Sequence, residues 1–102
     1  MNIYEALKKG NVNAFNIVLE RDDILIGVSK TKCKWPYPIF SEHPKDEILI
    51  VLNGKVRVEY ESGKKVLLKK GDIEVMKSGF GHKVHNSQSK PSETILIFPQ
   101  NL

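Results

Sequence analysis

Few residues of this chain can do chemistry, and three of them are histidines: His43, His82 and His85. Glu47 follows His43 by four residues. If two imidazoles and this carboxylate converge, they form a two-histidine, one-carboxylate site. Such a site binds divalent iron, manganese, nickel or zinc and leaves positions open for substrate or water. The alternative is that the histidines are solvated or lie in the core without binding a metal.

Period-two parity relates these residues to their neighbours. On a continuous strand Ser41, His43 and Glu47 would share one face, and Trp35 and Tyr37 have the same parity. A proline within this stretch makes a bend plausible, and a bend would still allow the side chains to converge. We predict a substrate pocket from the set Trp35, Tyr37, Ser41 and Met76. The alternative is that the aromatic side chains and Met76 fill the core.

His85 and Lys77 lie near His82 in the sequence, and each has more than one possible role. His85 comes three residues after His82, so on a strand it points to the opposite face and is either exposed or hydrogen-bonded. Lys77 could meet an anionic ligand at a barrel mouth, or it could be solvated.

The elements that position these residues are nearly all strands. Residues 2–9 form a predicted helix with Asn2 as its cap and Gly10 as its stop. Turns are predicted at Asn53-Gly54, as a hairpin, and at Ser62-Gly63 and Gly71-Asp72. Between them, short alternating or apolar runs predict strands at residues 15–20, 24–34, 47–52, 55–60, 66–69, 73–76, 82–85 and 94–98.

These strands predict an all-β fold, a small barrel or jelly roll with a short N-terminal helix. The run at residues 47–52 is apolar on both faces. Its outer side chains, Ile48, Ile50 and Leu52, should therefore be covered by a second sheet or a partner subunit. This run and the apolar strand at residues 94–98 motivate the prediction of a homodimer.

The composition narrows the function classes. The 102 residues suit one domain, and no apolar run is long enough to span a membrane. The net charge is +4, but 14 of the 16 basic residues are lysines scattered along the chain, which makes nucleic-acid binding unlikely. A single cysteine excludes an intrachain disulfide. With no signal sequence recognised, we expect a cytoplasmic protein.

Two segments resemble the two motifs of the cupin superfamily. Residues 43–47, followed by six residues and Gly54, are similar to the second half of the first motif, G-x5-H-x-H-x(3,4)-E-x6-G. The second motif, G-x5-P-x-G-x2-H-x3-N, is resembled by Gly71, Gly79, His82 and Asn86. The resemblance implies a small cupin-type double-stranded β-helix, that is, a jelly-roll barrel, over residues 1–102. It also implies that His43, Glu47 and His82 are the metal ligands.

The chain departs from the cupin motifs at three positions. Trp35 replaces the first glycine, Ser41 replaces the first histidine, and Lys77 replaces the proline. A serine hydroxyl is a poor ligand for a borderline metal. The site is therefore either a three-ligand site with an extra open position or a relic that no longer holds a divalent transition metal.

The resemblance implies a metal-dependent enzyme of the dioxygenase, isomerase or lyase type that acts on a small polar organic molecule. The alternative is a non-catalytic cupin that binds or senses a small molecule with a degenerate metal site. The third hypothesis is a nucleic-acid or protein interaction through the lysine surface, marked by a steep salt dependence.

Overall fold

The computed structural model describes residues 1–12, 15–31 and 46–99. These residues form one helix, α1 (Ile3–Lys9), and eight strands. The strands are β1 (Phe15–Glu20), β2 (Ile24–Thr31), β3 (Glu47–Asn53), β4 (Lys55–Tyr60), β5 (Lys65–Lys69), β6 (Ile73–Met76), β7 (His82–Asn86) and β8 (Ser92–Pro99). The predicted strands are confirmed wherever they fall in this part of the chain, and the end of the predicted strand at residues 24–34 lies outside it.

The helix begins where the sequence predicts. The Asn2 side chain accepts hydrogen bonds from the backbone N–H groups of Tyr4 and Glu5, so it satisfies two donors of the first turn. Gly10 ends the helix, and its N–H donates to the carbonyl of Ala6. No helix of the described residues is long and apolar enough to cross a membrane.

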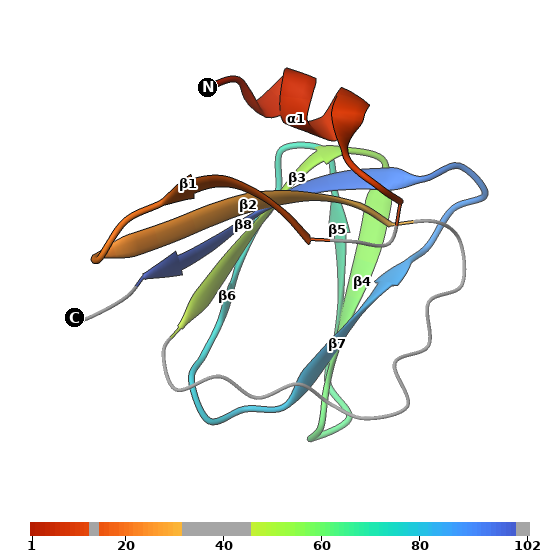
Figure 1. The fold of residues 1–102 in the computed structure, drawn as a ribbon. Coiled ribbons are helices and arrows are strands. Elements are labelled where there is room, and N and C mark those ends of the chain that lie inside the picture. Colours follow the sequence, from red (N-terminus) through yellow and green to blue (C-terminus); the bar gives the residue numbers. More distant parts are fainter. Residues whose placement is uncertain (13–14, 32–45, 100–102) are drawn as a thin grey trace.

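Two antiparallel sheets face each other in Figure 1, and α1 lies over the outer side of the larger one. The larger sheet has the strand order β1-β2-β8-β3-β6, and the smaller has the order β5-β4-β7. β2 and β3 are consecutive in the sequence but do not pair with each other, because β8 lies between them. This is the small jelly-roll architecture that the sequence predicts.

The main core lies between the two sheets. Leu49 and Val51 of β3 point inward and pack with Val56, Val58 and Leu68 from the smaller sheet. Residues of β3 with the other parity, Ile50 and Leu52, point outward. There they join a second cluster around Leu7 of α1 and Val28 of β2. The helix, which packs on β1 and β2, thus supplies part of the cover on this outer face, whereas the sequence analysis expected a second sheet or a partner subunit. Ile48, Ile50 and Leu52 stay only partly buried, and a covering partner subunit stays a prediction.

The prediction of a hairpin at Asn53-Gly54 is wrong. Gly54 does make a turn with a positive φ of 84°, but β3 pairs with β6 and β8, whereas β4 pairs with β5 and β7. The turn therefore carries the chain from one sheet to the other. By contrast, Gly63, with φ of 96°, lies in a true hairpin that joins β4 to β5.

We expect Gly54→Ala to lower the free energy of unfolding more than Gly63→Ala. Both substitutions place alanine at a positive φ, which costs about 1–2 kcal/mol. A Cβ at position 54 would also meet the Gln88 side chain and lie 2.6 Å from Ser92 Oγ, whereas none of the described atoms lies within 4 Å of a Cβ at position 63. This clash adds about 1–3 kcal/mol. Urea unfolding of both variants measures the difference, and equal losses would contradict it.

Candidate functional site

Two of the three predicted ligands face each other inside the barrel. Glu47 is the first residue of β3 and His82 is the first residue of β7, so the two sheets each contribute one. Both side chains are buried, with residue exposures of 4% for Glu47 and 6% for His82. The distance between His82 Nε2 and Glu47 Oε2 is 3.2 Å. Two residues that are 35 positions apart in the sequence are thus brought into direct contact.

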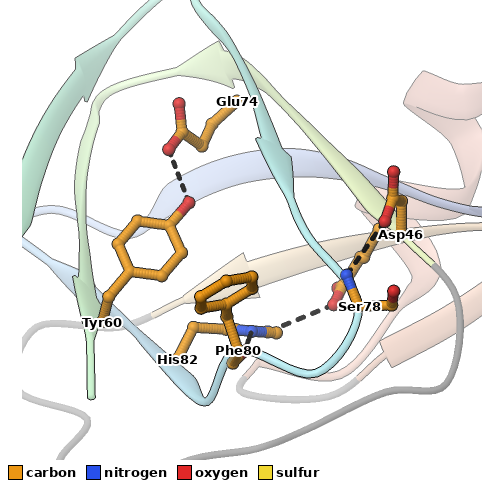
Figure 2. Close-up of polar contacts among 7 residues, drawn as sticks. Asp46, Tyr60, Glu74, Ser78, Phe80 and His82 are labelled. Atoms are coloured by element: carbon orange, nitrogen blue, oxygen red, sulfur yellow. Dashed lines mark hydrogen bonds and ion pairs between the residues drawn. The ribbon is translucent and has the colours of Figure 1, made fainter. Parts of the chain in front are cut away.

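The environment of His82 favours a positive charge at this point. Burial lowers the pKa of His82, but the hydrogen bond and charge of Glu47 and the Phe80 carbonyl raise it by more, so the net pKa is raised. Nδ1 of His82 lies 3.4 Å from the Phe80 carbonyl oxygen (Figure 2). When Nδ1 carries a proton toward Phe80, Nε2 faces the carboxylate with its lone pair. A proton or a metal cation between Nε2 and Oε2 relieves the resulting repulsion.

The separation of these two atoms fits ligands that share one metal ion. Two bonds of about 2.1 Å that meet at about 90–110° separate their ligand atoms by about 3.0–3.4 Å. Imidazole nitrogen and carboxylate oxygen are also a donor pair that divalent transition metals accept. No group of three His, Cys, Asp or Glu side chains gathers within residues 1–12, 15–31 and 46–99. The third predicted ligand, His43, lies outside these ranges.

The predicted pocket residues can be placed only in part. Trp35, Tyr37 and Ser41 lie outside the described residues. Met76 pairs with Glu47 in the register of β3 and β6, and its side chain is fully buried in the main core. Met76 therefore fills the core next to Glu47 on the neighbouring strand.

A tyrosine–glutamate pair lies nearby, and sequence reasoning missed it. Tyr60 is opposite His82 in the register of β4 and β7, and its hydroxyl donates a 2.5 Å hydrogen bond to Glu74 Oε2 of β6 (Figure 2). Burial first, and then the hydrogen bond and charge of Glu74, raise the pKa of Tyr60 well above its usual value. The phenol thus stays neutral and holds its proton toward Glu74. The available signal was that Tyr60 and Glu74 both have the parity of inward-facing neighbours.

The turn that precedes His82 is tied to the strand that carries Glu47. Asp46 Oδ1 accepts a 2.9 Å hydrogen bond from the backbone N–H of Ser78 (Figure 2). Gly79, with a positive φ of 80°, then turns the chain toward β7. This contact links the beginning of β3 with the approach to β7, so it helps to hold the two candidate ligands at a fixed distance.

His85 points away from the barrel interior, as strand parity predicts. Its Nε2 lies 3.4 Å from Glu59 Oε2 on the outer face of the smaller sheet. Burial first, and then the charge of Arg57, lower the pKa of His85; Lys83 acts in the same direction and Glu59 in the opposite one.

The lowered pKa of His85 predicts a pH-dependent stability. The unfolded chain, in which a histidine has its ordinary pKa of about 6.5, takes up this proton before the folded chain does. The contribution of neutral His85 is therefore complete above pH ~6.5 and is lost as the pH falls through the lower folded pKa. His82, whose pKa is raised, acts in the opposite direction, so the wild type must be compared with His85→Gln. Urea unfolding at several pH values should show that the variant loses less stability below neutral pH than the wild type; parallel curves would contradict this.

Comparison with known proteins agrees with this architecture. Residues 37–98, more than half of the chain, match the family described as Cupin domain. The chain therefore belongs to the cupin domain family. No curated protein matches it.

Solved structures of proteins from several organisms share the fold. A cupin-2 domain containing protein from Shewanella frigidimarina has a TM-score of 0.81 at 20% identity, over 98% of this chain and 94% of that one. A conserved protein with a double-stranded beta-helix domain from Klebsiella pneumoniae has a TM-score of 0.80 at 24% identity, over 99% and 90%. The Cnp3 cupin domain of Schizosaccharomyces pombe has a TM-score of 0.80 at 14% identity, over 93% and 72%. At these identities the likeness shows the shared fold alone.

Proposed function

We propose that this protein is a metal-dependent cupin enzyme, of the dioxygenase, isomerase or lyase type, that acts on a small polar organic molecule. The observation that carries the proposal is the buried contact between Glu47 and His82, 3.2 Å apart inside the barrel. Placing a carboxylate in the interior is costly unless a cation balances its charge. A divalent metal held between Glu47 and His82 would supply such a cation at this point.

In this proposal His43, Glu47 and His82 hold the metal, and Ser41 stands in the place of a fourth ligand. When bound, the metal supplies Lewis-acid catalysis or oxygen activation. The Phe80 carbonyl orients the His82 ring so that Nε2 is directed at Glu47. The Tyr60 hydroxyl holds a proton that it donates to Glu74. Tyr60 lies opposite His82 on the neighbouring strand.

Metal content tests this proposal directly. Untagged protein is purified without chelator and also reconstituted separately with Fe(II), Mn(II), Ni(II) and Zn(II), and bound metal is measured by mass spectrometry. About one equivalent of one of these metals per chain is expected. No retained metal under any of these conditions would refute the metalloenzyme and leave the second candidate.

The second candidate is a non-catalytic cupin that binds or senses a small molecule. Ser41, at the place of a motif histidine, favours it because the loss of a ligand weakens a metal site. A ligand that raises the melting temperature and is recovered unchanged would support this candidate. A ligand consumed in a metal-dependent manner would support the enzyme.

The proposal includes a single domain that forms a homodimer, and a cytoplasmic location stays a prediction. The pairing surface could use an open sheet edge, because an edge strand has unpaired backbone groups. We place it at β1, an edge strand on which Phe15 and Ile17 are exposed. Sedimentation should give a dimer at micromolar concentration for the wild type and for Leu67→Lys, an exposed position on the other sheet, but a monomer for Ile17→Lys. A monomeric wild type would refute the dimer.

A further inference from the structure

A hollow of about 570 Å³ opens between the turn that joins β4 to β5 and the edge strand β6. Its volume is in the range of sites that hold small organic molecules. Ser62 and Lys64 of the turn line one side, and Ile73, Val75, Lys77 and Phe80 line the other. Tyr60 and Glu74, which are joined by a hydrogen bond, line the same hollow, and Figure 2 shows this bond.

The charges around the hollow favour an anion. Lys64 and Lys77 contribute two ammonium groups from segments that lie on opposite sides. Within the part of the chain that the structure describes, neither ammonium group forms an ion pair. Among the described residues, Glu74 is the one carboxylate that lines the hollow, and the Tyr60 hydroxyl already donates to one of its oxygens. The lining therefore has an excess of positive charge.

The apolar side chains of the hollow are unusually accessible. Phe80 is 60% exposed and Ile73 is 62% exposed, and Val75 is also exposed. Each would gain free energy if an apolar group of a ligand covered it. An aromatic or short aliphatic group on Phe80 and Val75 would leave a carboxylate within reach of the flexible lysine side chains.

We propose that this hollow binds a small organic carboxylate that carries an aromatic or short aliphatic group. The lysines bind the carboxylate, and Phe80, Ile73 and Val75 contact the apolar part. This inference goes beyond the proposed function because no residue of the hollow is a candidate metal ligand and the binding requires no metal. The two sites are nevertheless neighbours, since the Phe80 carbonyl faces His82.

The test compares matched probes that differ only in charge. Full-length protein, with and without EDTA, is titrated by NMR with 3-phenylpropionate, 3-phenylpropanol, hexanoate and hexanol. At least one carboxylate should shift the resonances of Ile73, Val75 and Phe80, and it should bind about 5–10 times more tightly than its alcohol, as charge-assisted hydrogen bonds predict. Binding by neither carboxylate, or equal binding of acid and alcohol, would overturn the proposal.

Variants then locate the binding. Lys64→Gln and Lys77→Gln should each weaken carboxylate binding about 3–10-fold. Lys90→Gln, at an exposed lysine in the connection between β7 and β8, should leave it unchanged. Phe80→Ala should weaken acid and alcohol alike. An equal effect of Lys90→Gln, or binding that disappears with EDTA, would overturn the proposal, because the anion would then bind to general surface charge or to a metal. Metal content is measured separately, so failure here leaves the proposed metal site untouched.

Discussion

Replacing His82 with alanine is expected to weaken metal binding by at least about 100-fold, because in the proposed site this ring supplies one of the nitrogen ligands. Even residues that only orient a ligand cost 10–100-fold when they are replaced. Glu47→Gln should have a comparable effect, since it removes the charge that makes the carboxylate a good ligand while keeping its shape. Isothermal titration with the metal found in the purified protein measures both variants.

His85→Ala is the matched control for this experiment. His85 lies on the same strand, three residues away, but its side chain points to the outer face and contacts Glu59. The His85→Ala variant should therefore bind metal as the wild type does. Because His82→Ala leaves Glu47 buried without this partner, each variant is first checked for its fold by NMR. Folded His82→Ala and Glu47→Gln variants that both keep wild-type affinity would refute the site, and so would a loss of binding in His85→Ala that matches the loss in His82→Ala.

Leu49→Ala should lower the free energy of unfolding by about 3–5 kcal/mol, a large part of the total for a domain of this size. Leu49 is 1% exposed and lies between the two sheets, in the cluster that also includes Val58 and Met76. The neighbouring side chains cannot all collapse into the space, because they belong to two sheets that are each fixed by hydrogen bonds. Denaturant unfolding followed by fluorescence or circular dichroism measures the loss.

Leu67→Ala is the control for the same substitution on the surface. Leu67 lies on β5 and is 65% exposed, so its truncation should change stability by no more than about 0.5 kcal/mol. Equal losses in the two variants would mean that the cluster between the sheets is not the main source of stability.

The strands could be predicted because short runs that alternate, or that are apolar throughout, indicate buried strand faces. Leu49 and Val51 point inward and Ile50 and Leu52 outward, as parity requires. The strands that pair with a given strand could not be predicted in the same way, because pairing depends on residues far away in the chain. Asn53-Gly54 has the composition of a hairpin turn, yet β3 pairs with β8, whose paired residues lie 40 to 49 positions later. Nothing local distinguishes a turn within a sheet from a turn between sheets.

The candidate site, too, could be predicted only in part. Glu47 and His82 were predicted from motif positions, and the structure brings them together. The predictions for His43, Trp35, Tyr37 and Ser41 fall outside the described residues and stay predictions. Tyr60 and Glu74 escaped prediction because they come from different sheets, and no spacing in the sequence relates them. The only sequence signal for this pair was that Tyr60 and Glu74 are polar residues at inward-facing positions of otherwise apolar strand faces.

The position of β8 between β2 and β3 has a consequence for how the protein is made. Ile97 of β8 pairs with Ile26 on one side and Ile48 on the other. During synthesis, the first 91 residues can emerge from the ribosome while β2 and β3 still lack the strand that joins them. Until residues 92–99 follow, both strands present open edges that can aggregate or bind chaperones. The larger sheet can therefore close only after residues 92–99 have been synthesised, and folding should be slow compared with proteins whose contacts are local.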